Sequence, residues 1–112
     1  MSQVTTHILN TSTGKPAANV EVIFYGLQNN QWLQLAIGTT NQDGRLPDLL
    51  PTGSKLPPGI YKLKFETSQY FNDLQTKTFY PFVEIIFETT GPEHYHVPLL
   101  LNPFGYSTYR GS

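Results

Sequence analysis

Alternating apolar and polar residues divide this chain into short segments of the kind that form β-strands. Successive side chains of a strand point to opposite faces, so alternation with period two marks one buried and one exposed face. Clusters of Gly, Pro, Asn and Asp interrupt the segments and are typical of turns. The pattern predicts roughly seven or eight strands, which are residues 4–9, 20–27, 32–39, a return segment beginning at Arg45, and residues 60–65, 82–88, 95–101 and 106–110.

Several turns between these strands have specific signals. Asn29 and Asn30 tolerate positive φ and predict a tight turn. Asp43-Gly44 is a strong hairpin signal, so we expect the chain to reverse there. Residues 47–59 contain four prolines and two glycines and are expected to form a loop.

Residues 67–75 are the one helical candidate, with Thr67 or Ser68 as the predicted cap. The rest of the pattern favours mostly antiparallel strands packed as a sandwich. The predicted fold class is therefore all-β, with one short helix. At 112 residues the chain has the length of one domain, so we expect a single domain over residues 1–112.

The strand at residues 95–101 is apolar on both faces. A strand in a monomeric sandwich normally presents one polar face to water. Here Tyr95, Val97, Leu99 and Leu101 fall on one face, and the other carries His96, Pro98 and Leu100. The pattern predicts that the second face meets another subunit and that the chain forms a homo-oligomer.

Charge and composition exclude several classes of protein. Seven Lys and Arg against eight Asp and Glu give a net charge of −1, which argues against a nucleic-acid or membrane surface. The chain has no cysteine, so disulfides and thiolate chemistry are excluded. No leader opens the chain and no apolar run approaches the roughly 20 residues of a membrane span, so we expect a cytoplasmic protein.

Three histidines and one arginine are the candidates for chemistry. His94 and His96 lie two apart, so both point to one face about 6.5–7 Å apart along the strand. Such a pair could hold a metal with His7 or Glu93 as a third ligand. The alternatives are a structural role for His7, a solvated Arg45, and a surface or interface position for the pair.

Motifs along the whole chain resemble one family. HYHVPLLL at residues 94–101 and PFGYSTYRGS at residues 103–112 are similar to the signature of the transthyretin-related 5-hydroxyisourate hydrolases. Residues 6–10 with 14–17, and residues 40–45, resemble the family's N-terminal and middle motifs. Residues 59–61 and 79–81 also resemble the residues that the family has at these positions. The ending Tyr-Arg-Gly-Ser is the specific part, since the hormone-carrying transthyretins share the fold but lack it.

The resemblance implies both a fold and an activity. The fold would be a transthyretin-like sandwich of two four-stranded sheets with one short helix, assembled as a homotetramer with its sites at the dimer–dimer interface. The activity would be hydrolysis of 5-hydroxyisourate to 2-oxo-4-hydroxy-4-carboxy-5-ureidoimidazoline in urate degradation. No cofactor and no metal would be needed.

The resemblance also implies the site. The catalytic residues would be His7, Arg45, His96 and Ser112. His7 and Arg45 would bind substrate together with Tyr109, Arg110 and Gly111. His94 matches a motif position, but we expect no catalytic role for it.

The expected chemistry suits these residue types. A histidine titrates in the range needed to activate water, and an arginine can orient a planar ureide and stabilise the developing charge. We hypothesise that His7 or His96 is the base. The alternative functions are a transthyretin-like carrier of small ligands, without catalysis, and a structural sandwich whose histidines are incidental.

Overall fold

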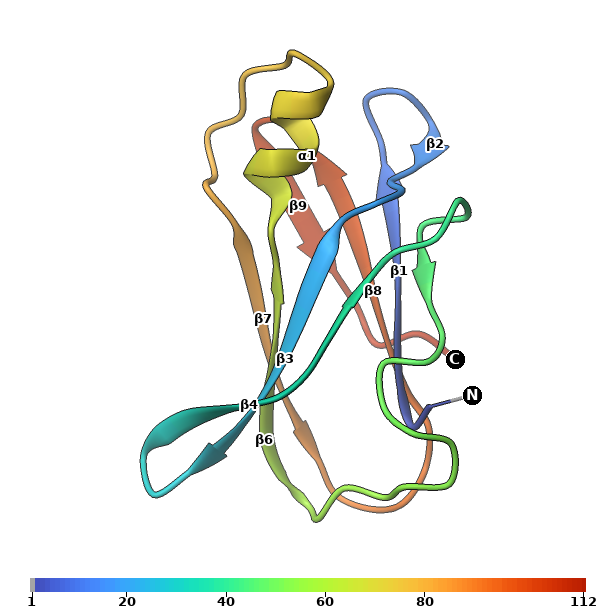
Figure 1. Cartoon of the computed structure of the whole chain (residues 1–112), viewed down its shortest axis with the longest axis vertical. Helices are drawn as coiled ribbons and strands as arrows, with labels where there is room; N and C mark the ends of the chain where they lie inside the picture. The colour runs from blue at the N-terminus through green and yellow to red at the C-terminus, as the bar shows by residue number, and fades with distance from the viewer. Residues whose placement is uncertain (1) are drawn as a thin grey trace.

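Two β-sheets face each other, with one helix at the end of the molecule that is uppermost in Figure 1. This computed structural model describes residues 2–112. The strands in chain order are β1 (Val4–Asn10), β2 (Lys15–Pro16), β3 (Glu21–Gln28), β4 (Gln31–Thr39), β5 (Arg45–Leu46), β6 (Gly59–Phe65), β7 (Val83–Thr89), β8 (Tyr95–Asn102) and β9 (Gly105–Thr108). The helix, α1, is Thr67–Asp73.

The two sheets differ in regularity. One has the order β4-β3-β6-β7, and each of its pairs is antiparallel. The other has the order β2-β1-β8-β9, with β5 also paired to β1. Within it β1 and β8 are parallel neighbours. The predicted all-β sandwich with one short helix is confirmed. One sheet has four strands as expected, whereas the other counts five because the two-residue strands β2 and β5 both lie along β1.

Apolar side chains that point inward from alternating strand positions form the core between the two sheets. On β1, Val4 and Ile8 are buried, and on β8 Leu99 and Leu101 are buried opposite the other sheet. The Phe24 ring stacks on Tyr61, with ring centroids 5.4 Å apart. The alternation predicted for residues 95–101 is confirmed, because the odd-numbered residues from 95 to 101 belong to this core.

The predicted turns form, but one of them has a different role. Asn29 and Asn30 have φ values of 51° and 62°, as expected for the tight turn between β3 and β4. Gly44 closes the next turn, with φ of 71° and its N–H donating to the Asn41 carbonyl at 2.9 Å. The chain does not return along β4. Instead, β5 crosses to the other sheet and pairs with β1, so the Asp-Gly signal marks a crossover between sheets.

The helix is shorter than predicted. It ends at Asp73, and its N-cap residue is Glu66, with no side-chain cap hydrogen bond. The predicted cap at Thr67 or Ser68 is wrong, since Thr67 already lies inside the helix. Tertiary contacts hold this element: Phe71 is buried, and the Asn10 side chain at the end of β1 donates to the Tyr70 hydroxyl at 3.0 Å.

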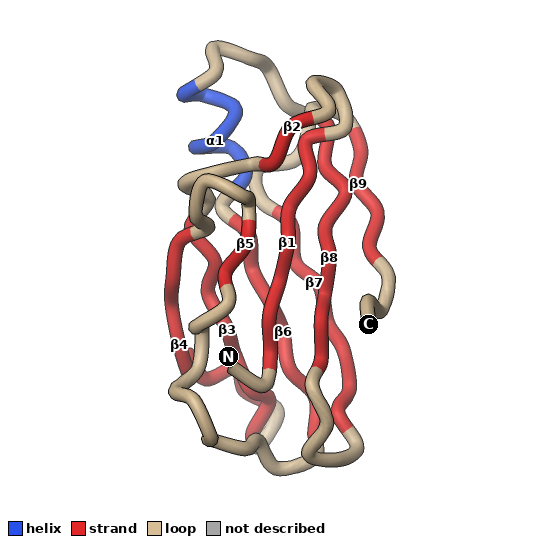
Figure 2. Tube along the Cα trace, turned by 90° about the vertical axis from the view of Figure 1, so that its right-hand side faces the viewer, coloured by secondary structure: helices blue, strands red, loops and turns tan. Residues whose placement is uncertain are grey.

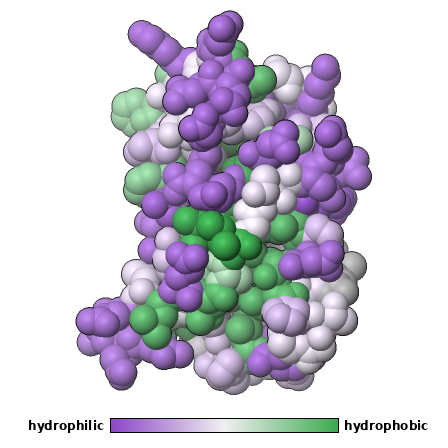
Figure 3. All heavy atoms as spheres, viewed as in Figure 1, coloured by the Kyte–Doolittle hydropathy of each residue, from purple (hydrophilic) through white to green (hydrophobic). Residues whose placement is uncertain are grey.

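The outer surface carries apolar groups outside the core. Figure 3 shows hydrophobic surface across the middle and lower part of the face that Figure 1 presents. On the edge strand β4, Leu33, Leu35 and Ile37 are all exposed. Within residues 2–112, no helix has the length and apolar character needed to cross a membrane.

Candidate active site

The pairing of β1 with β8 brings the predicted histidines to one outward face of a sheet. Figure 2 shows β1 between β5 and β8. The register pairs Thr5 with His96 across β1 and β8, and His7 with Arg45 across β1 and β5. Paired residues of neighbouring strands point to the same side. His7 and His96 therefore share the outer face of the sheet, as the period-two pattern predicts for each strand alone.

A pocket of about 200 Å³ opens on this face. It contains three of the four predicted catalytic residues, namely Arg45, His96 and Ser112. His7 does not line it directly but is half-buried opposite Arg45. The complete lining is Thr5, Thr6, Arg45, Pro47, His94, His96 and Ser112.

The position of Arg45 depends on the turn before it. The Asn41 side-chain oxygen accepts hydrogen bonds from the backbone N–H groups of Asp43 and Arg45, at 2.9 and 3.0 Å. The Gly44 carbonyl accepts the Ile8 N–H at 2.8 Å. A Cβ on Gly44 would lie 2.5 Å from the Ile8 carbonyl oxygen, so glycine is required where the turn meets β1.

The last residues are attached to the same strand that carries His96. The Gly111 N–H donates to the His96 carbonyl at 2.8 Å, and the two residues form an antiparallel bridge. A Cβ on Gly111 would lie 2.5 Å from His96 Cδ2, so the backbone passes directly over the imidazole. This bridge brings Ser112 to the pocket.

Tyr109 and Arg110 lie on the other side of this tail. They line a second pocket of about 240 Å³, which β7 also borders. The Arg110 guanidinium is 5.0 Å from the Tyr95 ring centroid and 3.8 Å from a Glu93 carboxylate oxygen. Tyr109 is 59% exposed. Of the predicted substrate-binding residues, these two thus line a different pocket from Arg45, and His96 borders both pockets.

Burial and charge both favour neutral imidazoles here. Partial burial, followed by the nearby Arg45 guanidinium, lowers the pKa of His7 below its usual value, although the Asp43 backbone and carboxylate oppose the shift. Burial, then Arg45, then His94 and His7 lower the pKa of His96. A neutral imidazole can accept a proton from water at neutral pH, so the arrangement suits base catalysis.

Thr5 is the main residue that sequence reasoning missed. Its hydroxyl lies 2.8 Å from His94 Nε2 and 2.8 Å from His96 Nδ1. The available signal was its place two residues before His7, which puts it on the same face. A threonine in a strand is common, however, so its partner could be identified only through the register with β8.

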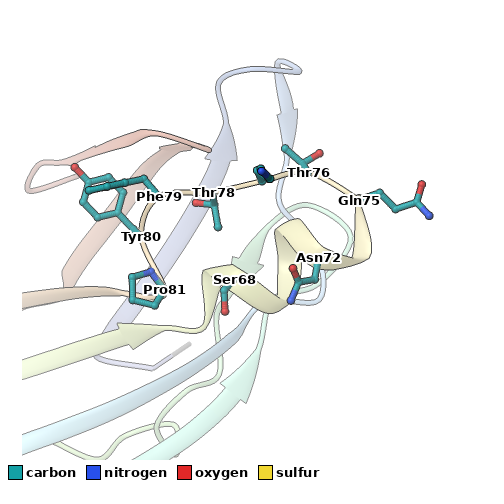
Figure 4. Close-up of a pocket in the computed structure, with 9 residues that line it drawn as sticks. Ser68, Asn72, Gln75, Thr76, Thr78, Phe79, Tyr80 and Pro81 are labelled. Atoms are coloured by element: carbon teal, nitrogen blue, oxygen red, sulfur yellow. The ribbon is translucent and has the colours of Figure 1, made fainter.

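The pocket beside α1 lacks this combination of groups. A pocket of about 460 Å³ lies beside α1 and the segment that follows it, and contains amide, hydroxyl and aromatic side chains (Figure 4). None of the predicted site residues lines it. Among residues 2–112, no group of three or more carboxylate and histidine side chains is arranged to hold a metal ion.

Comparison with known families identifies the relationship. The sequence model of the HIUase/Transthyretin family matches residues 4–111. The chain belongs to this family. Within it, a 5-hydroxyisourate hydrolase of Salmonella dublin is 49% identical over 95% of this chain and 78% of its own length. A 5-hydroxyisourate hydrolase of Mus musculus is 45% identical over 99% of this chain and 96% of its own.

Solved structures of a transthyretin and of a 5-hydroxyisourate hydrolase resemble this structure. Sea bream transthyretin in complex with thyroxine has a TM-score of 0.91 and 28% identity, covering 98% of this chain and 95% of its own. Klebsiella pneumoniae 5-hydroxyisourate hydrolase has a TM-score of 0.84 and 36% identity, covering 97% and 98%. Backbone shape is thus closely shared with a thyroxine-bound transthyretin and with a 5-hydroxyisourate hydrolase, so backbone shape alone does not separate the two.

Proposed function

We propose that this protein hydrolyses 5-hydroxyisourate, using the pocket formed by β1, β5, β8 and the C-terminal tail. The observation that carries the proposal is the bridge between Gly111 and His96, which brings Ser112 to the same pocket as Arg45 and His96. Relatives named as 5-hydroxyisourate hydrolases, 45–49% identical over nearly the whole chain, support the same conclusion.

The proposed reaction is hydrolysis of an amide-type C–N bond in the six-membered ring. His96 or His7 takes a proton from water, whose oxygen attacks the ring carbonyl. Arg45 holds the planar ureide through paired N–H donors and stabilises charge on the carbonyl oxygen. Ser112 orients water or substrate. The leaving ring nitrogen then receives a proton, and the C–N bond breaks.

A homotetramer would complete the site. The outer face of β1 and β8 carries Leu9, Pro98 and Leu100 beside the histidines, and a second subunit covering this face would enclose the pocket. We place the sites at the interface between dimers, where Tyr109, Arg110 and Gly111 of the tail would contact substrate. On this proposal the chain is a single-domain enzyme of urate degradation, located in the cytoplasm. The proposed reaction requires no metal.

The experiment is the decay of freshly generated 5-hydroxyisourate, followed by absorbance with and without protein. We expect wild type to accelerate the decay well beyond the spontaneous rate. His96→Ala, Arg45→Ala and deletion of residues 109–112 should each lower kcat/KM by about 10²–10⁴-fold. Lys77→Ala is the matched control, because Lys77 is a cation that lines the pocket beside α1 and its loss should leave the rate unchanged.

Two outcomes would contradict the proposal. Wild type that leaves the decay at its spontaneous rate while binding thyroxine at equilibrium would favour the carrier function, which the structural similarity to sea bream transthyretin makes the second candidate. Activity abolished by EDTA and restored by zinc would contradict the metal-free mechanism and favour a metal at the histidine pair.

A further inference from the structure

The Thr5 hydroxyl links two imidazoles that are far apart in sequence. Thr5 is only 6% exposed, and its Oγ1 lies 2.8 Å from both His94 Nε2 and His96 Nδ1. The two rings are inclined by 29° with centroids 6.2 Å apart. The two rings therefore lie close together, with the Thr5 hydroxyl in contact with both.

The chemistry of a hydroxyl restricts how these two contacts are made. A threonine hydroxyl has one hydrogen to donate and two lone pairs to accept with. When both imidazoles are neutral, the hydroxyl either accepts an N–H from both rings, which leaves its own hydrogen unused between them, or donates to one ring nitrogen and accepts an N–H from the other ring. The second arrangement uses the hydroxyl hydrogen within the contacts to the two rings. It orders the pair: one ring is protonated on the nitrogen facing Thr5, and the other is not.

The role of a base decides which of the two rings carries the proton that faces Thr5. His96 Nδ1 is occupied by Thr5, so Nε2 is the ring nitrogen left to meet water. To act as a base, Nε2 must carry a lone pair, and the ring proton then sits on Nδ1 and is donated to Thr5 Oγ1. The Thr5 hydroxyl hydrogen is in turn donated to His94 Nε2.

We propose that Thr5 is a proton-relay residue that fixes His96 as its Nδ1–H tautomer and connects it to His94. The proposal rests on the hydrolysis proposed above, and it identifies His96 rather than His7 as the base. It also gives a role to His94, which sequence analysis left without one.

The relay balances through one turnover. The O–H bond of water breaks and its proton moves to His96 Nε2, as the oxygen attacks the carbonyl. The Nδ1 proton passes to Thr5 Oγ1 while the Thr5 proton passes to His94 Nε2, so Thr5 stays neutral and His94 becomes imidazolium. The leaving ring nitrogen takes the Nε2 proton, and the reverse transfers return His96 and His94 to their starting forms.

The surroundings favour moving positive charge outward. The titratable and charged groups around the His96 ring are Arg45 from β5, His7 from β1 and His94, and together with burial they lower its pKa. His94 is exposed to solvent, where water solvates an imidazolium. The neighbouring Glu93 carboxylate is 3.8 Å from Arg110. The relay would thus carry a proton accepted at half-buried His96 to a ring that is in contact with water.

The first test is spectroscopic and needs no substrate. Long-range ¹H–¹⁵N spectra of ¹⁵N-histidine protein, at a pH of about 8 where neutral rings dominate, report which ring nitrogen is protonated. Wild type and Thr5→Ser should show His96 protonated at Nδ1 and His94 unprotonated at Nε2. Thr5→Val, which is nearly isosteric, should mix the two tautomers of His96. An unprotonated Nδ1 in wild type, or the same spectrum in Thr5→Val, would overturn the proposal.

The second test is kinetic. Thr5→Val should lower kcat by about 10- to 100-fold with KM within about twofold, whereas Thr5→Ser should stay within about threefold of wild type. His94→Ala, at an exposed position that tolerates change, should lose as much as Thr5→Val, and the double variant should lose no more than either alone. Losses that multiply in the double variant would overturn the relay.

The two readouts separate the proposals. If wild type does not accelerate the decay of 5-hydroxyisourate, the hydrolysis fails and the relay fails with it, even where the spectra show the ordered pair. If wild type is active and the Thr5 variants are as active as wild type, only the relay fails. Circular dichroism and thermal unfolding of each variant exclude loss of fold as the cause.

Discussion

Arg45 has two effects on the site at the scale of single residues. Its guanidinium lines the pocket, and its charge lowers the pKa of both His7 and His96. A lowered pKa extends the pH range in which these rings are neutral. The base form is then present at pH 7 and is lost only as the pH falls through the lowered pKa.

Arg45→Gln should therefore shift the pH dependence as well as the rate. Without the cation the pKa of His96 rises, so the acid limb of the kcat/KM profile should move to higher pH, in addition to an overall loss of activity. The profile of kcat/KM reports groups of the free enzyme. Arg110→Gln is the control, because Arg110 is not among the causes of the His96 shift. An acid limb that stays in place in Arg45→Gln would contradict this account.

Part of this site could be predicted from the sequence. Alternation with period two correctly predicted that His96 and Pro98 share one face of β8, and the same period puts Thr5 and His7 on one face of β1. The register between the two strands was beyond prediction, since alternation repeats every two residues and leaves the relative shift open. Only that register sets Thr5 opposite His96, which is why the hydroxyl between the histidines was missed.

The same limit applies at the scale of secondary-structure elements. The turn at Asp43-Gly44 was predicted from local chemistry, and it forms. The partner of β5 was not predictable, because hydrogen bonding to β1 rather than β4 depends on how the two sheets pack. The capping residue of the helix was misjudged for a related reason: contacts of the helix with the core and with Asn10, rather than a capping side chain, hold it.

Gly44 and Gly14 provide a matched pair for testing the turn. Both have positive φ, 71° and 74°, but a Cβ at Gly14 meets nothing within 4 Å whereas one at Gly44 would lie 2.5 Å from the Ile8 carbonyl oxygen. Gly14→Ala should destabilise folding by about 1 kcal/mol through backbone strain alone. Gly44→Ala should cost about 3 kcal/mol or more and should lower activity, because β5 carries Arg45.

Denaturant unfolding and the absorbance assay measure these two effects. Equal stability losses in Gly44→Ala and Gly14→Ala would show that the contact between the turn and β1 is unimportant. Wild-type activity in Gly44→Ala would show that Arg45 does not depend on this contact.

At the scale of the whole molecule, the outer face of β1 and β8 is the surface that the proposed tetramer covers. Leu9 and Leu100 are paired there and half-buried within one chain. A charge buried at such a place without a partner is strongly unfavourable. The predicted assembly and the predicted site thus depend on the same few positions.

Leu100→Glu should convert the proposed tetramer to a smaller species and lower activity with it. Ile37→Glu is the control, since Ile37 on β4 is 53% exposed and belongs to the other sheet. Analytical ultracentrifugation gives the mass and the absorbance assay gives the rate. A tetramer that persists in Leu100→Glu, or one that is absent in wild type, would contradict the proposed assembly.

The parallel pairing of β1 with β8 has a consequence for how the protein is made. Thr5 and His96 are paired neighbours, yet they lie 91 positions apart. Contacts between segments so distant require closure of a long loop and form slowly. During synthesis β1 must wait for β8 before it gains its central neighbour, while β3, β4 and β6 can already pair. The nascent chain should therefore bring the Thr5 hydroxyl and the His96 imidazole together only after β8 has been synthesised.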